Sequence, residues 1–202
     1  LTEDMLANRA VRLIQSGQMV SYLGNVYRSR TAYIEAHLAE MISRRLSQHK
    51  SFCYTDLDAE LDKEEQILAV KLAPEQRLAV KTALTHGISI ITGGPGTGKT
   101  MIQGALLDIY KRTHPGNEIC CCAPTGRAAR RMEQSTRFSA STVHKALGLL
   151  AGEDGNYNEP AELTADLILV DEVSMLDIYL AEHLFCAVKN NCLIVLIGDA
   201  DQ

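Results

Sequence analysis

Residues 88–100 of this chain read Ile88-Ser89-Ile90-Ile91-Thr92-Gly93-Gly94-Pro95-Gly96-Thr97-Gly98-Lys99-Thr100. A short run rich in β-branched residues leads into a glycine-rich loop, and an amphipathic helix pattern begins near Lys99. Gly93, four intervening residues and then Gly98-Lys99-Thr100 fit the phosphate-binding P-loop pattern. Because this pattern lies between a strand and a helix, it predicts a nucleoside triphosphate site rather than a simple glycine turn.

The residue types of the loop match the chemistry of holding phosphates. Glycines allow the dihedrals that turn backbone N–H groups inward around a phosphate, and the following helix adds the positive end of its dipole. Lys99 is expected to contact the β- and γ-phosphates, and the Thr100 hydroxyl is expected to ligate Mg²⁺. The predicted nucleotide-binding residues of the loop are Gly93, Gly94, Pro95, Gly96, Thr97, Gly98, Lys99 and Thr100.

Strands and helices alternate beyond the loop. Buried strands are expected at 118–123, 167–170 and 192–197, with helices between them. This order predicts an α/β fold in which helices cover both faces of a parallel sheet. Open α/β sheets bind ligands at the carboxyl ends of their strands. The candidate functional segments all follow strands, at 93–100, 124–127, 171–172 and 198–202.

Two carboxylates end the strand expected at 167–170. Asp171 follows apolar residues, as an acid that faces Mg²⁺ beside a P-loop should. Glu172 is then placed to act as general base or to orient the water that attacks the γ-phosphate. The alternative is a pair of surface acids after a strand. Gln202, at the end of the next strand, is expected to sense the γ-phosphate.

A glutamine lies on the helix that precedes the P-loop strand. Pro74 is expected to open this helix and Gly87 to close it. The Gln76 side chain offers both a donor and an acceptor, so it could pair with the adenine edge of ATP. A solvated helix residue is the alternative interpretation.

The first part of the chain shows no chemical motif. Helices are expected at 3–16 and 30–47, with a weak hairpin signal around Gly24-Asn25 between them. An acidic segment, 56–65, is expected to be a linker that runs into a helix. We therefore predict two units, a mainly helical module of residues 1–71 and a nucleotide-binding domain of residues 72–202.

Composition limits the possible partners and compartments. The formal net charge is −5, so a polyanion would have to meet a local basic patch. Arg127, Arg130, Arg131 and Lys145 form such a patch, for which polynucleotide contact and a solvated helix face remain equal interpretations. The cysteines contain no CxxC pair and are expected to be buried free thiols. Without a signal peptide or a long apolar run, the sequence favours a cytoplasmic protein.

Several segments in combination resemble superfamily 1 DNA helicases of the RecD type, which include exonuclease V alpha subunits. In that family these segments are motifs I, Ia, Ib, II and III, and Gln76 falls where the adenine-reading Q motif belongs. The resemblance covers about residues 72–202. Its segments here are Gly93–Thr100, Ala123–Ala129, Thr142–His144, Val170–Met175 and Gly198–Gln202.

The resemblance implies a RecA-like motor domain that hydrolyses ATP with Mg²⁺ and moves 5′ to 3′ along single-stranded DNA. It implies DNA contacts from Pro124, Thr125, Arg127, Thr142 and His144, and γ-phosphate sensing by Gln202. Residues 149–165 fall where the family carries a small inserted hairpin that can split the duplex. Nuclease–helicase subunits are further expected partners.

The family also has a second RecA-like domain that supplies an arginine finger, and the sequence ends as motif III is completed. We therefore expect an amino-terminal fragment of a longer helicase that does not unwind DNA alone. Arg127, Arg130 and Arg131 are expected to face DNA and not to replace that finger. A P-loop kinase and a nucleotide-dependent switch or loader are the alternative functions. Stimulation of ATP turnover by single-stranded DNA would distinguish the helicase from both.

Overall fold

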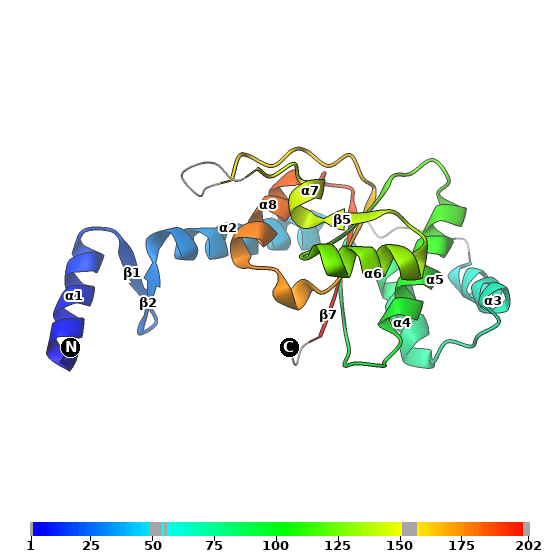
Figure 1. The fold of residues 1–202 in the computed structure, drawn as a ribbon, viewed down its shortest axis with the longest axis horizontal. Coiled ribbons are helices and arrows are strands. Elements are labelled where there is room, and N and C mark those ends of the chain that lie inside the picture. The colour runs from blue at the N-terminus through cyan, green and yellow to red at the C-terminus, as the bar shows by residue number, and fades with distance from the viewer. Residues whose placement is uncertain (1, 49–53, 55, 151–156, 200–202) are drawn as a thin grey trace.

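The structure, a computed structural model, describes residues 2–48, 54, 56–150 and 157–199 (Figure 1). The helices are α1 (Glu3–Gln15), α2 (Ser29–Gln48), α3 (Leu57–Leu68), α4 (Pro74–Thr85), α5 (Lys99–Thr113), α6 (Gly126–Thr136), α7 (Val143–Ala146), α8 (Ile178–Ala187) and the 3-10 turn η1 (Val173–Met175). The strands are β1 (Met19–Tyr22), β2 (Asn25–Arg28), β3 (Ile88–Thr92), β4 (Ile119–Ala123), β5 (Ala140–Thr142), β6 (Leu167–Val170) and β7 (Leu193–Gly198).

The main sheet is parallel and has the order β3-β7-β6-β4-β5. Alternate residues of its central strands enter two separate cores. Leu167 and Leu169 of β6 pack with α3, α4 and α5 on one face, whereas Ile168 and Val170 pack with α7 and α8 on the other. Helices thus cover both faces, and the predicted α/β fold class is confirmed.

Local signals place the helices that carry the site. Pro74 occupies the first turn of α4, where a missing backbone N–H has no cost. The Thr125 hydroxyl accepts a hydrogen bond from the Ala128 N–H and caps α6.

One strand of the structure was not predicted from the sequence. The structure forms the short strand β5 from Ala-Ser-Thr, a sequence with no apolar alternation that could have predicted it.

The amino-terminal part consists of α1, the hairpin β1–β2 and α2 (Figure 1). α1 and the hairpin project away from the main sheet, and α2 leads from them back to it. The predicted hairpin is confirmed, with β1 and β2 paired antiparallel. Its turn residues are Leu23 and Gly24, both with positive φ, one position before the predicted Gly24-Asn25. Along α2, Ile34 is buried, and α2 packs against α8. The Leu61 side chain of α3 is buried in the core around α5. The boundary at residue 71 stays a prediction.

The described cysteines are free, as expected, but they differ in exposure. Cys121, Cys122 and Cys192 are buried, whereas Cys186 is exposed and departs from the expectation. Burial raises the pKa of the Cys121 and Cys192 thiols to about 12, which keeps them protonated near neutral pH. Within the described ranges, no helix is long and apolar enough to cross a membrane.

Candidate nucleotide-binding site

The loop between β3 and α5 has the backbone that its glycines predict. Gly96 and Gly98 have φ of 78° and 84°, a left-handed region that favours glycine. A Cβ on Gly93 would lie 2.6 Å from Thr97 Oγ1, so a side chain there would displace the threonine. The Thr97 hydroxyl in turn donates to the Gly94 carbonyl at 2.9 Å. The loop is therefore tightly folded around its own backbone.

Lys99 is the first residue of α5, and its ammonium lies across the loop. Its Nζ donates to the carbonyl oxygens of Gly93 and Gly94, the latter at 3.1 Å. The positive charge is thus already held where the loop and the helix N-terminus meet, which is where an anion is most stable. A phosphate bound there would compete for the same ammonium.

Gln76 ties the start of α4 to the P-loop. Its Oε1 accepts from the Ala73 N–H at 2.9 Å, and its Nε2 donates to the Thr97 carbonyl at 3.0 Å. A Cβ on Gly98 would lie 2.4 Å from Gln76 Nε2, so a side chain there would displace the amide, and the positive φ of Gly98 also favours glycine. One amide hydrogen and one carbonyl lone pair remain for another partner. The predicted adenine contact is compatible with this arrangement and stays a prediction.

The two carboxylates after β6 lie on a constrained turn. The Asp171 N–H donates to the Cys122 carbonyl at 3.0 Å, which continues the pairing of β6 with β4. Glu172 has φ 52° and ψ 40°, an uncommon conformation for a non-glycine residue. A Cβ on Gly198 would lie 2.8 Å from Val173 Cγ1, so β7 packs closely beneath this turn. Strain of this kind is often found at functional sites.

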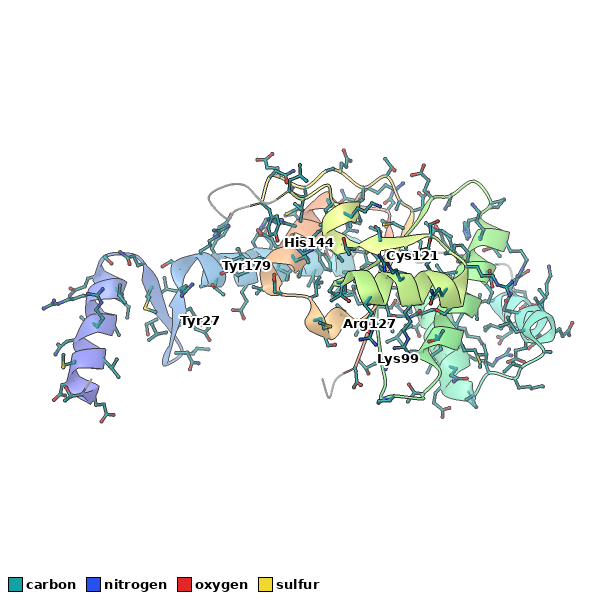
Figure 2. All side chains as sticks on the ribbon, viewed as in Figure 1. Tyr27, Lys99, Cys121, Arg127, His144 and Tyr179 are labelled. Atoms are coloured by element: carbon teal, nitrogen blue, oxygen red, sulfur yellow. The ribbon has the colours of Figure 1, made fainter. Side chains whose placement is uncertain are left out.

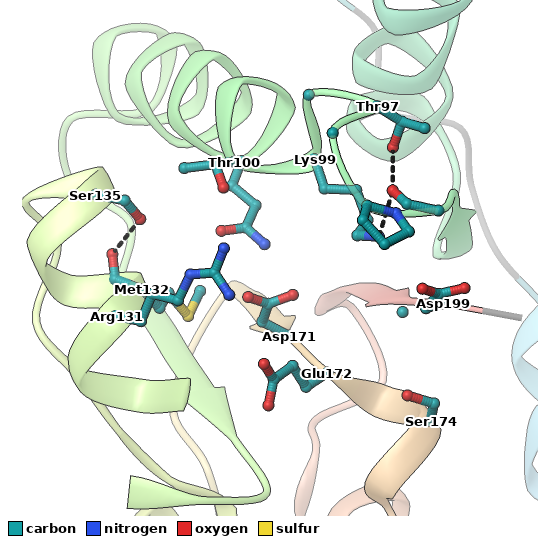
Figure 3. Close-up of a pocket in the computed structure, with 16 residues that line it drawn as sticks. Thr97, Lys99, Thr100, Arg131, Met132, Ser135, Asp171, Glu172, Ser174 and Asp199 are labelled. Carbon is teal, nitrogen blue, oxygen red and sulfur yellow. Dashed lines mark hydrogen bonds between the residues drawn. The ribbon is translucent and has the colours of Figure 1, made fainter. Parts of the chain in front are cut away.

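A cavity of about 360 Å³ brings the P-loop and these carboxylates together (Figure 3). Thr100 and Asp171, the two predicted Mg²⁺ ligands, both line it and offer the oxygen donors that Mg²⁺ prefers. Glu172 also lines it, so the alternative of unrelated surface acids is not favoured. The cavity lining also includes Ser174, Gly198 and Asp199, which belong to the predicted segments Val170–Met175 and Gly198–Gln202. The lining residues outside every predicted site segment are Gln103, Arg131, Met132 and Ser135.

Arg131 lines this cavity, a position that the sequence did not predict. The reason is the course of α6, which leaves β4 at the carboxyl edge and packs against α5. Its second turn therefore lies over the P-loop. Helical spacing alone does not reveal this, because it gives the face of α6 but not its neighbour. The expectation that Arg131 faces DNA stays a prediction.

The residues predicted to contact DNA lie outside the cavity lining. The Thr125 and Thr142 hydroxyls act as N-caps of α6 and α7, accepting from Ala128 and Lys145. Pro124 is half-buried and Arg127 is exposed at the start of α6. The two threonines thus have structural roles that the sequence pattern did not indicate, and DNA contact by these residues stays a prediction.

The ring of His144, on α7, packs beside the ring of Tyr157, which lies within the predicted hairpin segment 149–165. The His144 and Tyr157 rings lie 5.1 Å apart at an interplanar angle of 54° (Figure 2 labels His144). Asn158 holds this segment, since its side chain accepts from the Leu150 N–H and donates to the Gly148 carbonyl. Residues 151–156 of the hairpin and Gln202 lie outside the described residues, so their predicted roles are not tested.

Comparisons with known proteins agree with this site. A family model described as an AAA domain matches residues 76–202. An ATP-dependent RecD2 DNA helicase of Deinococcus radiodurans is 42% identical over 65% of this chain and 18% of its own length. A RecBCD enzyme subunit RecD of Haemophilus influenzae is 32% identical over 93% of this chain and 33% of its own length.

A solved structure of Pif1 helicases at forked DNA aligns with a TM-score of 0.49 and 21% identity, over 66% of this chain and 34% of that chain. The chain spans only a third or less of the lengths of the two RecD-type relatives described above. The family match covers the P-loop, the carboxylate turn and the end of β7 in one continuous stretch. The chain therefore belongs to this family of AAA domains, and its sequence is that of a RecD-like P-loop domain.

Proposed function

We propose that this chain is the ATP-binding motor domain of a DNA helicase, which hydrolyses ATP with Mg²⁺ to move 5′ to 3′ along single-stranded DNA. The main support is the convergence of Lys99, Thr100, Asp171 and Glu172 on one cavity. A P-loop beside two carboxylates suits hydrolysis, because one acid can hold the metal while the other activates water. The RecD-like sequence supports DNA as the polymer.

In this proposal each residue has a distinct task. Lys99 and the loop N–H groups hold the β- and γ-phosphates, and Thr100 and Asp171 hold Mg²⁺. The metal supplies charge neutralisation when it is bound. Glu172, which lines the cavity, accepts a proton from the attacking water. Gln202 completes the assignment as a γ-phosphate sensor.

DNA is proposed to bind along the loops at 124–127 and 142–144, which follow β4 and β5. The exposed Arg127 would contact a phosphate, and His144 with Tyr157 would stack on bases. A second RecA-like domain and nuclease–helicase subunits are the proposed protein partners, and the cytoplasm is the proposed location.

The test is ATP turnover by the complete protein with and without single-stranded DNA. A helicase motor should hydrolyse ATP several-fold faster when DNA is present. A P-loop kinase would consume ATP only with a small phosphate acceptor, and a switch or loader would not respond to naked DNA. Turnover that DNA does not change would reject the helicase assignment in favour of those two classes.

Gln76→Ala should remove most of the preference for ATP over GTP. A bidentate contact to a base edge is worth about 1–3 kcal/mol, by analogy with base readout in DNA. Competition binding of ATP and GTP to the complete protein measures the preference. Gln76→Glu is the matched variant, because it keeps the acceptor that bonds Ala73 but loses the donor. Equal affinities of the unmutated protein for ATP and GTP would show that Gln76 does not select adenine.

Tyr157→Ala should weaken single-stranded DNA binding by about tenfold, which corresponds to about 1.4 kcal/mol. Base–aromatic stacking contributes about 1–3 kcal/mol per base, and Tyr157 is an exposed ring held beside His144. Fluorescence anisotropy with a labelled oligonucleotide measures the affinity. Tyr22→Ala removes an exposed ring on the hairpin β1–β2 and serves as the control. If both variants bind DNA equally well, Tyr157 does not stack on DNA.

A further inference from the structure

Arg131 is an arginine without a partner among the described residues. The structure gives it no hydrogen bond and no ion pair there, whereas Arg77 and Arg112 are each held by two or more carboxylates. Its guanidinium reaches over Asp171 into the P-loop cavity (Figure 3). Because a guanidinium in a concave site can bind an anion with two parallel N–H donors, this placement indicates a ligand that carries negative charge.

The charges that line the cavity support the same conclusion. Three carboxylates, those of Asp171, Glu172 and Asp199, face two cations, Lys99 and Arg131. A nucleoside triphosphate adds negative charge even when Mg²⁺ accompanies it. Without Arg131, one lysine would oppose all of these charges in a site partly shielded from water, where like charges repel strongly. Arg131 is thus the second cation in the lining that can offset the charge of a triphosphate.

The helix that carries Arg131 is rigidly placed. The buried Ala128, Ala129 and Met132 side chains fix α6 against the sheet and α5, and Thr125 caps its first turn. Arg131 lies on the turn between the cap and the carboxyl end of α6, so its backbone needs no rearrangement to present the guanidinium. The backbone of Arg131 is thus fixed, and only the torsions of its exposed side chain must be ordered when the guanidinium binds a ligand.

We infer that Arg131 binds the terminal phosphate of a nucleoside triphosphate from the same domain that carries the P-loop. The inference rests on the proposed nucleotide-binding function and adds a residue to that site. Arg131 then reports whether the bound nucleotide carries a third phosphate, because a diphosphate ends closer to Lys99 and the loop. Its loss should therefore affect a triphosphate more than a diphosphate.

The test compares the affinities of the complete protein for a non-hydrolysable ATP analogue and for ADP, each with Mg²⁺ and without DNA. Arg131→Ala should weaken analogue binding about 10- to 100-fold, the range for losing a charge-assisted hydrogen bond, and ADP binding by less than about twofold. Arg131→Lys keeps the charge but not the two-pronged geometry, and should give an intermediate loss. Arg130→Ala is the matched control for nucleotide affinity, because Arg130 is exposed like Arg131 but lines none of the described cavities.

Retained ADP binding shows that a variant is folded, and Arg131→Gln repeats the test if the alanine variant aggregates. If Arg131→Ala and Arg130→Ala bind the analogue equally well, Arg131 does not contact the nucleotide. If Arg131→Ala weakens analogue and ADP binding equally, Arg131 does not recognise the terminal phosphate. Failure of the unmutated protein to bind either nucleotide would instead reject the proposed function together with this inference.

Discussion

A Glu172→Gln variant of the complete protein should still bind ATP and Mg²⁺, while its DNA-stimulated turnover falls about 10²–10⁴-fold, the usual contribution of a general base. Glutamine keeps the size of the side chain and accepts hydrogen bonds, but it cannot take a proton from water at neutral pH. The strained φ of 52° at Glu172 is a backbone property and should persist in the variant. Single-turnover ATPase measurements, alongside equilibrium binding of ATP, separate the two effects.

A Lys99→Ala variant should differ from Glu172→Gln, because it should lose ATP binding as well as turnover. It removes the ammonium that lies across the P-loop, so ATP affinity and turnover should both fall.

Glu133→Gln is the matched control for Glu172→Gln. It makes the same chemical change on the exposed side of α6, outside the cavity, and should leave turnover unchanged. Normal hydrolysis by Glu172→Gln would assign the base to another group.

The parts of the fold that sequence could predict are those set by local patterns. The P-loop requires glycines at fixed positions, and Gly96 and Gly98 adopt the positive φ values that explain them. Apolar runs of four to six residues between helical segments predict parallel strands, and β6 and β7 are fully or nearly fully buried. Because the carboxyl ends of parallel strands lie at one edge of the sheet, the same pattern predicts that Lys99 and Asp171 line one cavity.

The remaining parts depend on tertiary packing. Arg131 looked equivalent to Arg127 and Arg130 in sequence, and only the packing of α6 against α5 brings it to the nucleotide cavity. The Thr125 hydroxyl satisfies a helix N-terminus, a structural role that competes with the DNA contact implied by resemblance. The pairing of His144 with Tyr157 joins residues whose separation in sequence carries no periodic signal.

Packing also connects the two units that the sequence predicted. Arg112, near the end of α5, donates from Nε to Glu60 at 2.7 Å and from Nη1 to Glu64 at 2.7 Å. Both acids belong to α3, which lies before the predicted boundary at residue 71. The Glu64 side chain is only 1% exposed, and its other oxygen has no hydrogen-bond partner among the described residues. The Arg112 guanidinium is therefore the group that compensates a buried negative charge.

Arg112→Ala should lower the free energy of unfolding around α3 and α5 by about 3–5 kcal/mol, the usual cost of leaving one partner of a buried ion pair uncompensated. Hydrogen exchange of the α3 and α5 amides in the complete protein measures this local stability. Arg44→Ala is the matched control, because its ion pair with Glu40 is 57% and 70% exposed and should contribute less than about 1 kcal/mol.

A second variant separates the charge from the packing of the arginine stem. Glu64→Leu combined with Arg112→Met replaces the buried pair by apolar side chains of similar volume, so much of the lost stability should return, as it does when buried ion pairs are replaced as a unit. Glu60, the other partner of Arg112, is 28% exposed and can be solvated by water. If Arg112→Ala has no larger effect than Arg44→Ala, Glu64 does not depend on Arg112. In that case α3 is joined to the nucleotide-binding domain by the apolar contacts of Leu61 and by the ion pairs of Arg77 with Asp58, Asp62 and Glu65.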